Sequence, residues 1–77
     1  MKRLEIETFF DTCYLGENRI NNRFSFVEGV VSCIASCPEN RVYLDFDENR
    51  VTQVELEGIF SQMEFPIYST RIKTIGK

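Results

Sequence analysis

Cysteine is the residue type in this chain with the most distinctive chemistry. The 77 residues include three cysteines, Cys13, Cys33 and Cys37, and no histidine. Without histidine the usual zinc sites and a catalytic imidazole are excluded, so a soft metal ion would have to be bound through sulfur. An odd number of cysteines without an export signal favours free thiols over a disulfide framework.

Cys13 lies in the stretch FFDTCYLGENR, between an alternating apolar run and the expected start of a helix. Unpaired backbone N–H groups at a helix N-terminus favour a thiolate and lower the pKa of a cysteine. The carboxylates of Asp11 and Glu17 act in the opposite direction. The stretch is therefore compatible with a reactive thiol, a metal ligand or a loop cysteine that has no task.

Cys33 and Cys37 fall four residues apart in a short run of β-branched and small residues. In a strand this even spacing places both on one face, with Ala35 between them. At a rise of ~3.3 Å per residue they lie ~13 Å apart, too far for a mutual disulfide or a shared ion. Buried free cysteines pack as small hydrophobic residues, so we expect both to belong to the core, Cys37 less firmly because it reaches a turn.

Four short segments are predicted as strands from their alternation and composition. They are residues 4–8, 31–37, 42–47 and 64–69. In the third, Val42, Leu44 and Phe46 alternate with polar residues and should face the core. The basic tail, residues 71–77, is expected either to fray or to extend the last strand.

Two helices are predicted from apolar residues at helical spacing. The first, residues 17–27, carries Ile20, Phe24 and Val27 on one face and is expected to end at Gly29. The second follows Thr52 and Glu55, which have the spacing of a capping box. Its apolar face is expected to consist of Leu56, Ile59, Phe60 and Met63.

The order βαββαβ predicts an α+β fold, the ferredoxin-like sandwich. In it, a four-stranded antiparallel sheet is covered on one face by two helices. We expect residues 1–77 to form a single domain, because a chain this short has apolar residues for one core. This fold hosts many unrelated functions, so it does not decide the function by itself.

Composition excludes several classes of function. A net charge of −3 without a basic stripe argues against nucleic acid. Acids in the third strand, RVYLDFDEN, replace the aromatic platform of an RNA-recognition module. The sequence contains no run of ~20 apolar residues, which a membrane-spanning helix would need. The N-terminus carries charges where a signal peptide would be apolar, so we expect a cytoplasmic protein. Acids flank Gly16, which disfavours a phosphate-binding catalytic loop, and we do not expect an enzyme.

The pattern as a whole resembles the heavy-metal-associated domain family, which includes copper chaperones and domains of metal-pumping ATPases. In that family a strand leads into Met-x-Cys-x-x-Cys, and a helix starts at the second cysteine. Cys13 takes the first cysteine position, and without gaps Gly29-Val30, residues 46–49 and Glu64-Phe65 match later features of the family. The resemblance covers Leu4 to about Ser69.

The metal-binding motif departs from the family pattern. Gly16 occupies the position of the second cysteine, and Asp11 occupies the position of the methionine. The resemblance implies that the Asp11 side chain points inward, unless a local register shift lets Phe10 fill that position and leaves Asp11 facing solvent. A solvent-facing Asp11 could add a carboxylate that shifts the preference toward zinc, which we disfavour. Phe65 matches a residue that packs against the metal loop, but we favour the simpler interpretation that it is a core residue, and both can hold.

The resemblance implies binding or hand-over of a soft ion such as Cu(I) through Cys13. With Gly16 opposite it, the second thiolate would come from another copy of the chain or from a partner such as a metal-transporting ATPase. In the family fold, the second strand runs away from the metal loop, so Cys37 is expected far from Cys13. The alternative is a scaffold that has lost metal binding and acts as a protein-interaction module.

Overall fold

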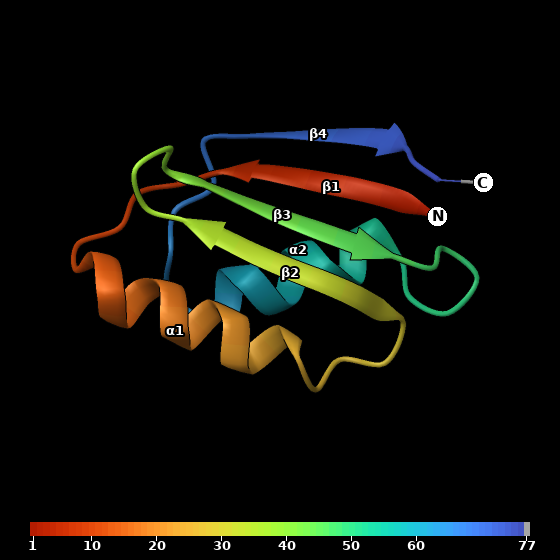
Figure 1. Ribbon diagram of the computed structural model, residues 1–77, viewed down its shortest axis with the longest axis horizontal. Coiled ribbons are helices and arrows are strands. Elements are labelled where there is room, and N and C mark those ends of the chain that lie inside the picture. Colours follow the sequence, from red (N-terminus) through yellow and green to blue (C-terminus); the bar gives the residue numbers. More distant parts are fainter. Residues whose placement is uncertain (77) are drawn as a thin grey trace.

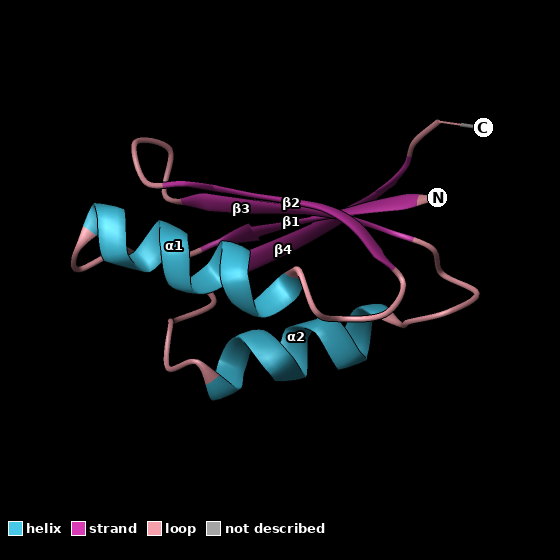
Figure 2. Cartoon of the chain, turned by 60° about the horizontal axis from the view of Figure 1, so that its bottom comes forward, coloured by secondary structure: helices cyan, strands magenta, loops and turns pink. Residues whose placement is uncertain are grey.

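The computed structural model describes residues 1–76 and has the predicted order of elements. These are β1 (Lys2–Glu7), α1 (Cys13–Phe24), β2 (Val30–Ser36), β3 (Arg41–Phe46), α2 (Gln53–Gln62) and β4 (Ser69–Thr74). The sheet order is β2-β3-β1-β4, and all three neighbouring pairs are antiparallel. Both helices cover the same face of the sheet (Figure 1, Figure 2). The predicted ferredoxin-like sandwich is confirmed.

The alternating strands place their apolar residues between the sheet and the helices. In β1 and just after it, Leu4, Ile6 and Thr8 are buried, as predicted. The largest fully buried side chains also include Val42, Leu44 and Phe46 from β3, Ile20 and Phe24 from α1, and Leu56 and Phe60 from α2. None of the helices in residues 1–76 is long and apolar enough to cross a membrane.

The first helix begins and ends earlier than predicted. It starts at Cys13, directly after Thr12 in an extended conformation, and ends at Phe24. The prediction placed its start at Glu17 because the apolar periodicity becomes regular only there. Gly29 does not end the helix. It lies in the following loop at a φ of +96°, a left-handed conformation that glycine adopts without a steric penalty.

The second helix begins as the sequence predicts. The Thr52 hydroxyl accepts a hydrogen bond from the Glu55 N–H at 3.2 Å, and the Glu55 carboxylate accepts one from the Thr52 N–H at 2.9 Å. This reciprocal pair is a complete capping box. On the predicted apolar face, Leu56 and Phe60 are buried, while Ile59 and Met63 are half-buried against the core.

The last strand begins at Ser69, five residues after the predicted start at Glu64. Glu64 has a φ of +70° and ends the turn after α2, and Pro66 has no N–H to donate to a sheet. The segment instead crosses the end of β1, where the Thr8 hydroxyl donates a hydrogen bond to the Pro66 carbonyl at 2.6 Å. Most of the basic tail extends β4 through Thr74, and Lys77 lies outside the described residues.

Candidate functional site

Cys13 and Cys37 are joined by a disulfide, with their Cα atoms 5.3 Å apart. This overturns the expectation that Cys37 lies far from Cys13, and the expectation that both are free thiols. Cys33 is the free cysteine in the described residues. Cys13 is an exposed residue at the start of α1, whereas Cys37 is buried directly after the end of β2.

The topology explains why these two cysteines meet. A short loop, residues 25–29, reverses the chain, so that β2 runs back alongside α1 (Figure 1). Twelve helical residues span ~18 Å and seven strand residues span ~23 Å, so the end of β2 reaches the beginning of α1. The turn between β2 and β3 therefore lies beside the N-terminal end of α1, where Cys13 is, and not at the opposite end of the molecule as predicted. We call this region the thiol end.

Side chains at four-residue spacings on one face of α1 contact the cysteines at and just after β2. Glu17 lies four residues after Cys13, on the same helix face, and its carboxylate accepts a hydrogen bond from the Cys37 N–H at 2.7 Å. One turn further along, the Asn21 side-chain oxygen accepts a bond from the Cys33 thiol at 3.4 Å. These contacts were not predicted from the sequence, although the four-residue spacing of Cys13, Glu17 and Asn21 was the signal that could have revealed them.

Cys33 packs against the core, as predicted. It is half-buried between β2 and α1, and it pairs with Leu44 of β3. Burial raises the pKa of its thiol from 9.0 to about 12, because the charged thiolate would lose its hydration there. Cys33 is therefore an unreactive structural thiol at neutral pH.

The N-terminal end of α1 has no side-chain partner for its free N–H groups. Thr12 is the N-cap residue, but its hydroxyl makes no capping hydrogen bond, and the first turn contains no acidic residue. Unpaired helix N–H groups stabilise a nearby negative charge. Cys13 is the first residue of this helix and lies beside these N–H groups.

Gly16 provides space for an aromatic side chain. A Cβ atom built on Gly16 would lie 2.8 Å from Cδ1 of Phe10, and Phe10 is only 5% exposed. Phe10 thus points into the interior beneath the loop, and Asp11 is exposed. The expectation that Asp11 points inward is wrong, and the alternative with a shifted register describes the observed loop.

Phe65 packs against this loop from the segment that precedes β4. Its ring centroid lies 6.0 Å from that of Phe10 and 5.6 Å from that of Phe60. The guanidinium carbon of Arg19 lies 5.2 Å from the centre of the Phe65 ring, and an Arg19 N–H donates to the Met63 carbonyl at 3.3 Å. Arg19 therefore contacts its own chain here.

The residues predicted as neighbours of one site lie on two sides of α1. Asp11, Gly16 and Phe65 line a cleft of about 470 Å³ between the loop after β1 and the segment after α2. Cys13 is bonded to Cys37 on the side of α1 that faces β2. Within residues 1–76, no cluster of three or more histidine, cysteine or acidic residues could hold a metal ion.

Comparison with known proteins supports the fold. No protein-family model matches the chain, and no curated protein matches it either. Among solved structures, the yeast copper transporter domain CCC2A, determined in apo and Cu(I)-loaded states, is similar with a TM-score of 0.77 and 24% identity, over 87% of this chain and 92% of that chain. A copper-binding domain from HMA7, a P-type ATPase, is similar with a TM-score of 0.77 and 20% identity, over 96% of both chains. The chain therefore has the fold of these copper-binding domains.

Proposed function

We infer that the chain is a small metal-binding module, not an enzyme, and that it holds a soft ion such as Cu(I) through the thiolate of Cys13. The observation that carries this proposal is the position of Cys13. It is exposed at the first residue of α1, beside helix N–H groups that lack side-chain partners. The two solved structures with the same fold are copper-binding domains, which supports the same class of cargo.

The donor chemistry fits a soft ion of low coordination number. Thiolates are soft ligands that bind Cu(I) well, whereas a structural zinc site usually needs four nitrogen or sulfur ligands. The chain contains no histidine, and Asp11 lines the cleft on the other side of α1. We therefore favour Cu(I) over zinc as the cargo.

Metal binding at Cys13 requires the reduced protein, because a disulfide sulfur is not a thiolate ligand. We accordingly expect the module to work in a reducing compartment such as the cytoplasm. Hand-over to a metal-transporting ATPase, or sharing of the ion with a second copy, would proceed by exchange of thiolate ligands at the exposed Cys13.

Competition for Cu(I) tests this function. The fully reduced protein is titrated without oxygen against a chromophoric Cu(I) chelator, alongside Cys13→Ser and the matched control Cys33→Ser. We expect sub-micromolar binding by the original chain and by Cys33→Ser, and loss of competition in Cys13→Ser. Equal competition by Cys13→Ser would exclude Cys13 as a ligand and reject the proposal.

An interaction module without metal is the second candidate, and one observation favours it. Three large apolar side chains that are close to Cys13 in the sequence are exposed: Phe9 at 49%, Tyr14 at 73% and Leu15 at 59%. Apolar groups gathered on a surface commonly mark a site of protein contact. No competition for Cu(I) at any protein concentration would favour this candidate, whereas sub-micromolar competition would favour the metal module.

A further inference from the structure

We propose that Cys37 is the second metal ligand. In the reduced protein, Cys13 and Cys37 bind one soft ion within a single chain, and their disulfide is the metal-free, oxidised form of the same site. This proposal rests on the proposed function and replaces the thiolate from a second chain or partner. The pair does not follow the Cys-x-x-Cys motif, because 24 positions of the sequence separate the two residues.

The Cys37 backbone is held in place independently of the disulfide. Its N–H donates to the Glu17 carboxylate at 2.7 Å, and its carbonyl accepts from the Asn40 N–H at 3.0 Å. Immediately before it, Ser36 pairs with Arg41 in the antiparallel ladder of β2 and β3. Reduction breaks none of these contacts, so Cys37 stays beside the first turn of α1 when the two sulfurs separate.

Cys13 is the ligand that can move. It is exposed, whereas Cys37 is only 8% exposed and packs in the core. A metal–thiolate bond of about 2.3 Å implies that two sulfurs in line across an ion lie roughly 4.6 Å apart. A change of rotamer moves a cysteine sulfur by roughly 3 Å, so Cys13 can open this spacing while the Cα atoms remain 5.3 Å apart.

The position of Gly16 cannot take over the role of second ligand. Any side chain there would meet Phe10, whose ring already lies 2.8 Å from the place of a Cβ atom. Phe10 is itself packed beside Phe65 and has little room to withdraw. Cys37 beside Cys13 therefore supplies the second thiolate that a cysteine at position 16 would supply in a Cys-x-x-Cys motif.

The disulfide form becomes the metal-bound form in two steps, reduction and metal binding. A dithiol reductant transfers two electrons and two protons to the Cys13–Cys37 bond, gives two thiols, and becomes a cyclic disulfide itself. Binding of one Cu(I) then releases two thiol protons to solvent and forms two copper–sulfur bonds. Oxidation by a disulfide reagent removes both ligands at once, so metal binding is confined to reducing conditions.

Stoichiometry and ligand identity are measured on the reduced protein. Cu(I) per chain is determined by elemental analysis after desalting, and mass by sedimentation, for the original chain, Cys13→Ser, Cys37→Ser and Cys33→Ser. We expect one Cu(I) per monomer in the original chain and in Cys33→Ser. In the chelator titration, the Cu(I) affinity should fall at least about 100-fold in both Cys13→Ser and Cys37→Ser. Even the loss of a supporting contact to a metal ligand lowers affinity by up to that factor.

The outcomes separate this inference from the proposed function. If Cys37→Ser keeps the original affinity while Cys13→Ser loses it, with one Cu(I) per two chains, the function stands and the role of Cys37 is rejected. If Cys13→Ser binds as well as the original chain, the function itself is rejected. The unreduced protein should bind no Cu(I) until the reductant is added, and binding by the intact disulfide form would contradict the two-state site.

Because Cys37 is buried, its variant could fail to fold, so a second measurement uses the unmodified sequence. The reduced chain is alkylated with and without Cu(I), for long enough that both Cys13 and Cys37 are modified in the metal-free protein, and each cysteine is quantified by peptide mass spectrometry. Cu(I) should protect Cys13 and Cys37 together and leave the slow modification of Cys33 unchanged. Protection of Cys13 alone would overturn the inference.

Discussion

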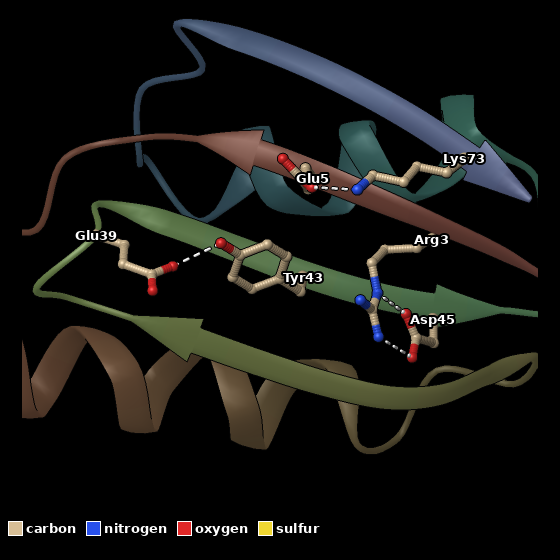
Figure 3. Close-up of polar contacts among 6 residues, drawn as sticks. All are labelled: Arg3, Glu5, Glu39, Tyr43, Asp45 and Lys73. Carbon is tan, nitrogen blue, oxygen red and sulfur yellow. Dashed lines mark hydrogen bonds and ion pairs between the residues drawn. The ribbon is translucent and has the colours of Figure 1, made fainter. Parts of the chain in front are cut away.

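The open face of the sheet and the thiol end of α1 differ in whether their polar groups have partners within the chain. On the open face, Arg3 donates two hydrogen bonds to Asp45 at 2.7 and 3.1 Å, and Lys73 lies 3.4 Å from Glu5. Figure 3 shows these pairs together with the bond from the Tyr43 hydroxyl to Glu39, which is 2.6 Å long. The charged groups drawn there already have partners within the chain.

The N-terminal end of α1 carries the Cys13–Cys37 disulfide and several exposed apolar side chains. Phe9, Tyr14 and Leu15 lie within four residues of Cys13 in the sequence and are at least 49% exposed. The first turn of α1 lacks a side-chain cap. The comparison shows that the charged groups of the sheet face are paired within the chain, whereas the N–H groups in the first turn of α1 lack a side-chain cap and are open to a ligand or partner. Four measurements test this contrast, beginning with the largest expected effect.

Removal of the disulfide should have the largest effect on stability. The bond joins residues 24 positions apart, and closing a loop of that length destabilises the unfolded chain by about 3.5 kcal/mol through lost conformational entropy. The double variant Cys13→Ser/Cys37→Ser should therefore lose about that much free energy of unfolding in urea, relative to the oxidised chain. The control Cys33→Ser keeps the disulfide, so added reductant should destabilise it, whereas the double variant should not respond to reductant. A double variant as stable as the oxidised chain would contradict the disulfide.

Gly16 and Gly58 offer a matched pair of helix substitutions. In both, alanine gains up to about 1 kcal/mol in helix propensity. Gly58 has open space around it, so Gly58→Ala should raise the free energy of unfolding by that amount. Gly16→Ala must displace Phe10, at a typical cost of about 1–3 kcal/mol, so its net effect should be a loss of about 1 kcal/mol. Stabilisation by both variants in thermal unfolding would refute the close packing of Gly16 against Phe10.

The ion pairs of the sheet face should contribute little. Both oxygens of Asp45 are bound by Arg3, but the Arg3 side chain is 37% exposed, and exposed pairs typically contribute less than about 1 kcal/mol. A double-mutant cycle with Arg3→Ala and Asp45→Ala should give a coupling energy below that value. It should also leave Cu(I) affinity unchanged. A large coupling energy, or an altered affinity, would show that the sheet face is not merely solvated.

The Cys33 thiol should have no effect on the pH dependence of stability near neutrality. Its pKa is raised from 9.0 to about 12 by burial, so the folded state retains the proton that the unfolded state loses. This contribution to stability is fully present below pH 9 and is lost as the pH rises toward 12. The difference in unfolding free energy between the original chain and Cys33→Ala should therefore be constant from pH 6 to 8, and should fall above pH 9. A difference that does not change with pH up to 10.5 would contradict the burial of this thiol.

Several local features could be predicted from the sequence because neighbouring residues decide them. The period-two alternation of Leu4, Ile6 and Thr8 places these residues on the buried face of a strand, whichever strand pairs beside it. The spacing of Thr52 and Glu55 is enough to close a capping box. The lack of histidine limits soft-metal chemistry to sulfur, whatever fold the chain adopts.

The composition of the candidate site depended on tertiary structure. Phe10 excludes a side chain at Gly16 only because the loop after β1 folds over the first turn of α1. The late start of β4 depends on where its backbone can pair with β1, and not on the apolar residues that precede it.

The cysteine residues by themselves therefore determine that any soft ion here is bound by thiolates, since ligand chemistry is a property of the side chain. Which thiolates can act together was decided by the return of β2 along α1, a matter of helix rise, strand length and the short loop between them. Those distances bring Cys37 to Cys13 across 24 positions of the sequence, a proximity that no local pattern of residues encodes.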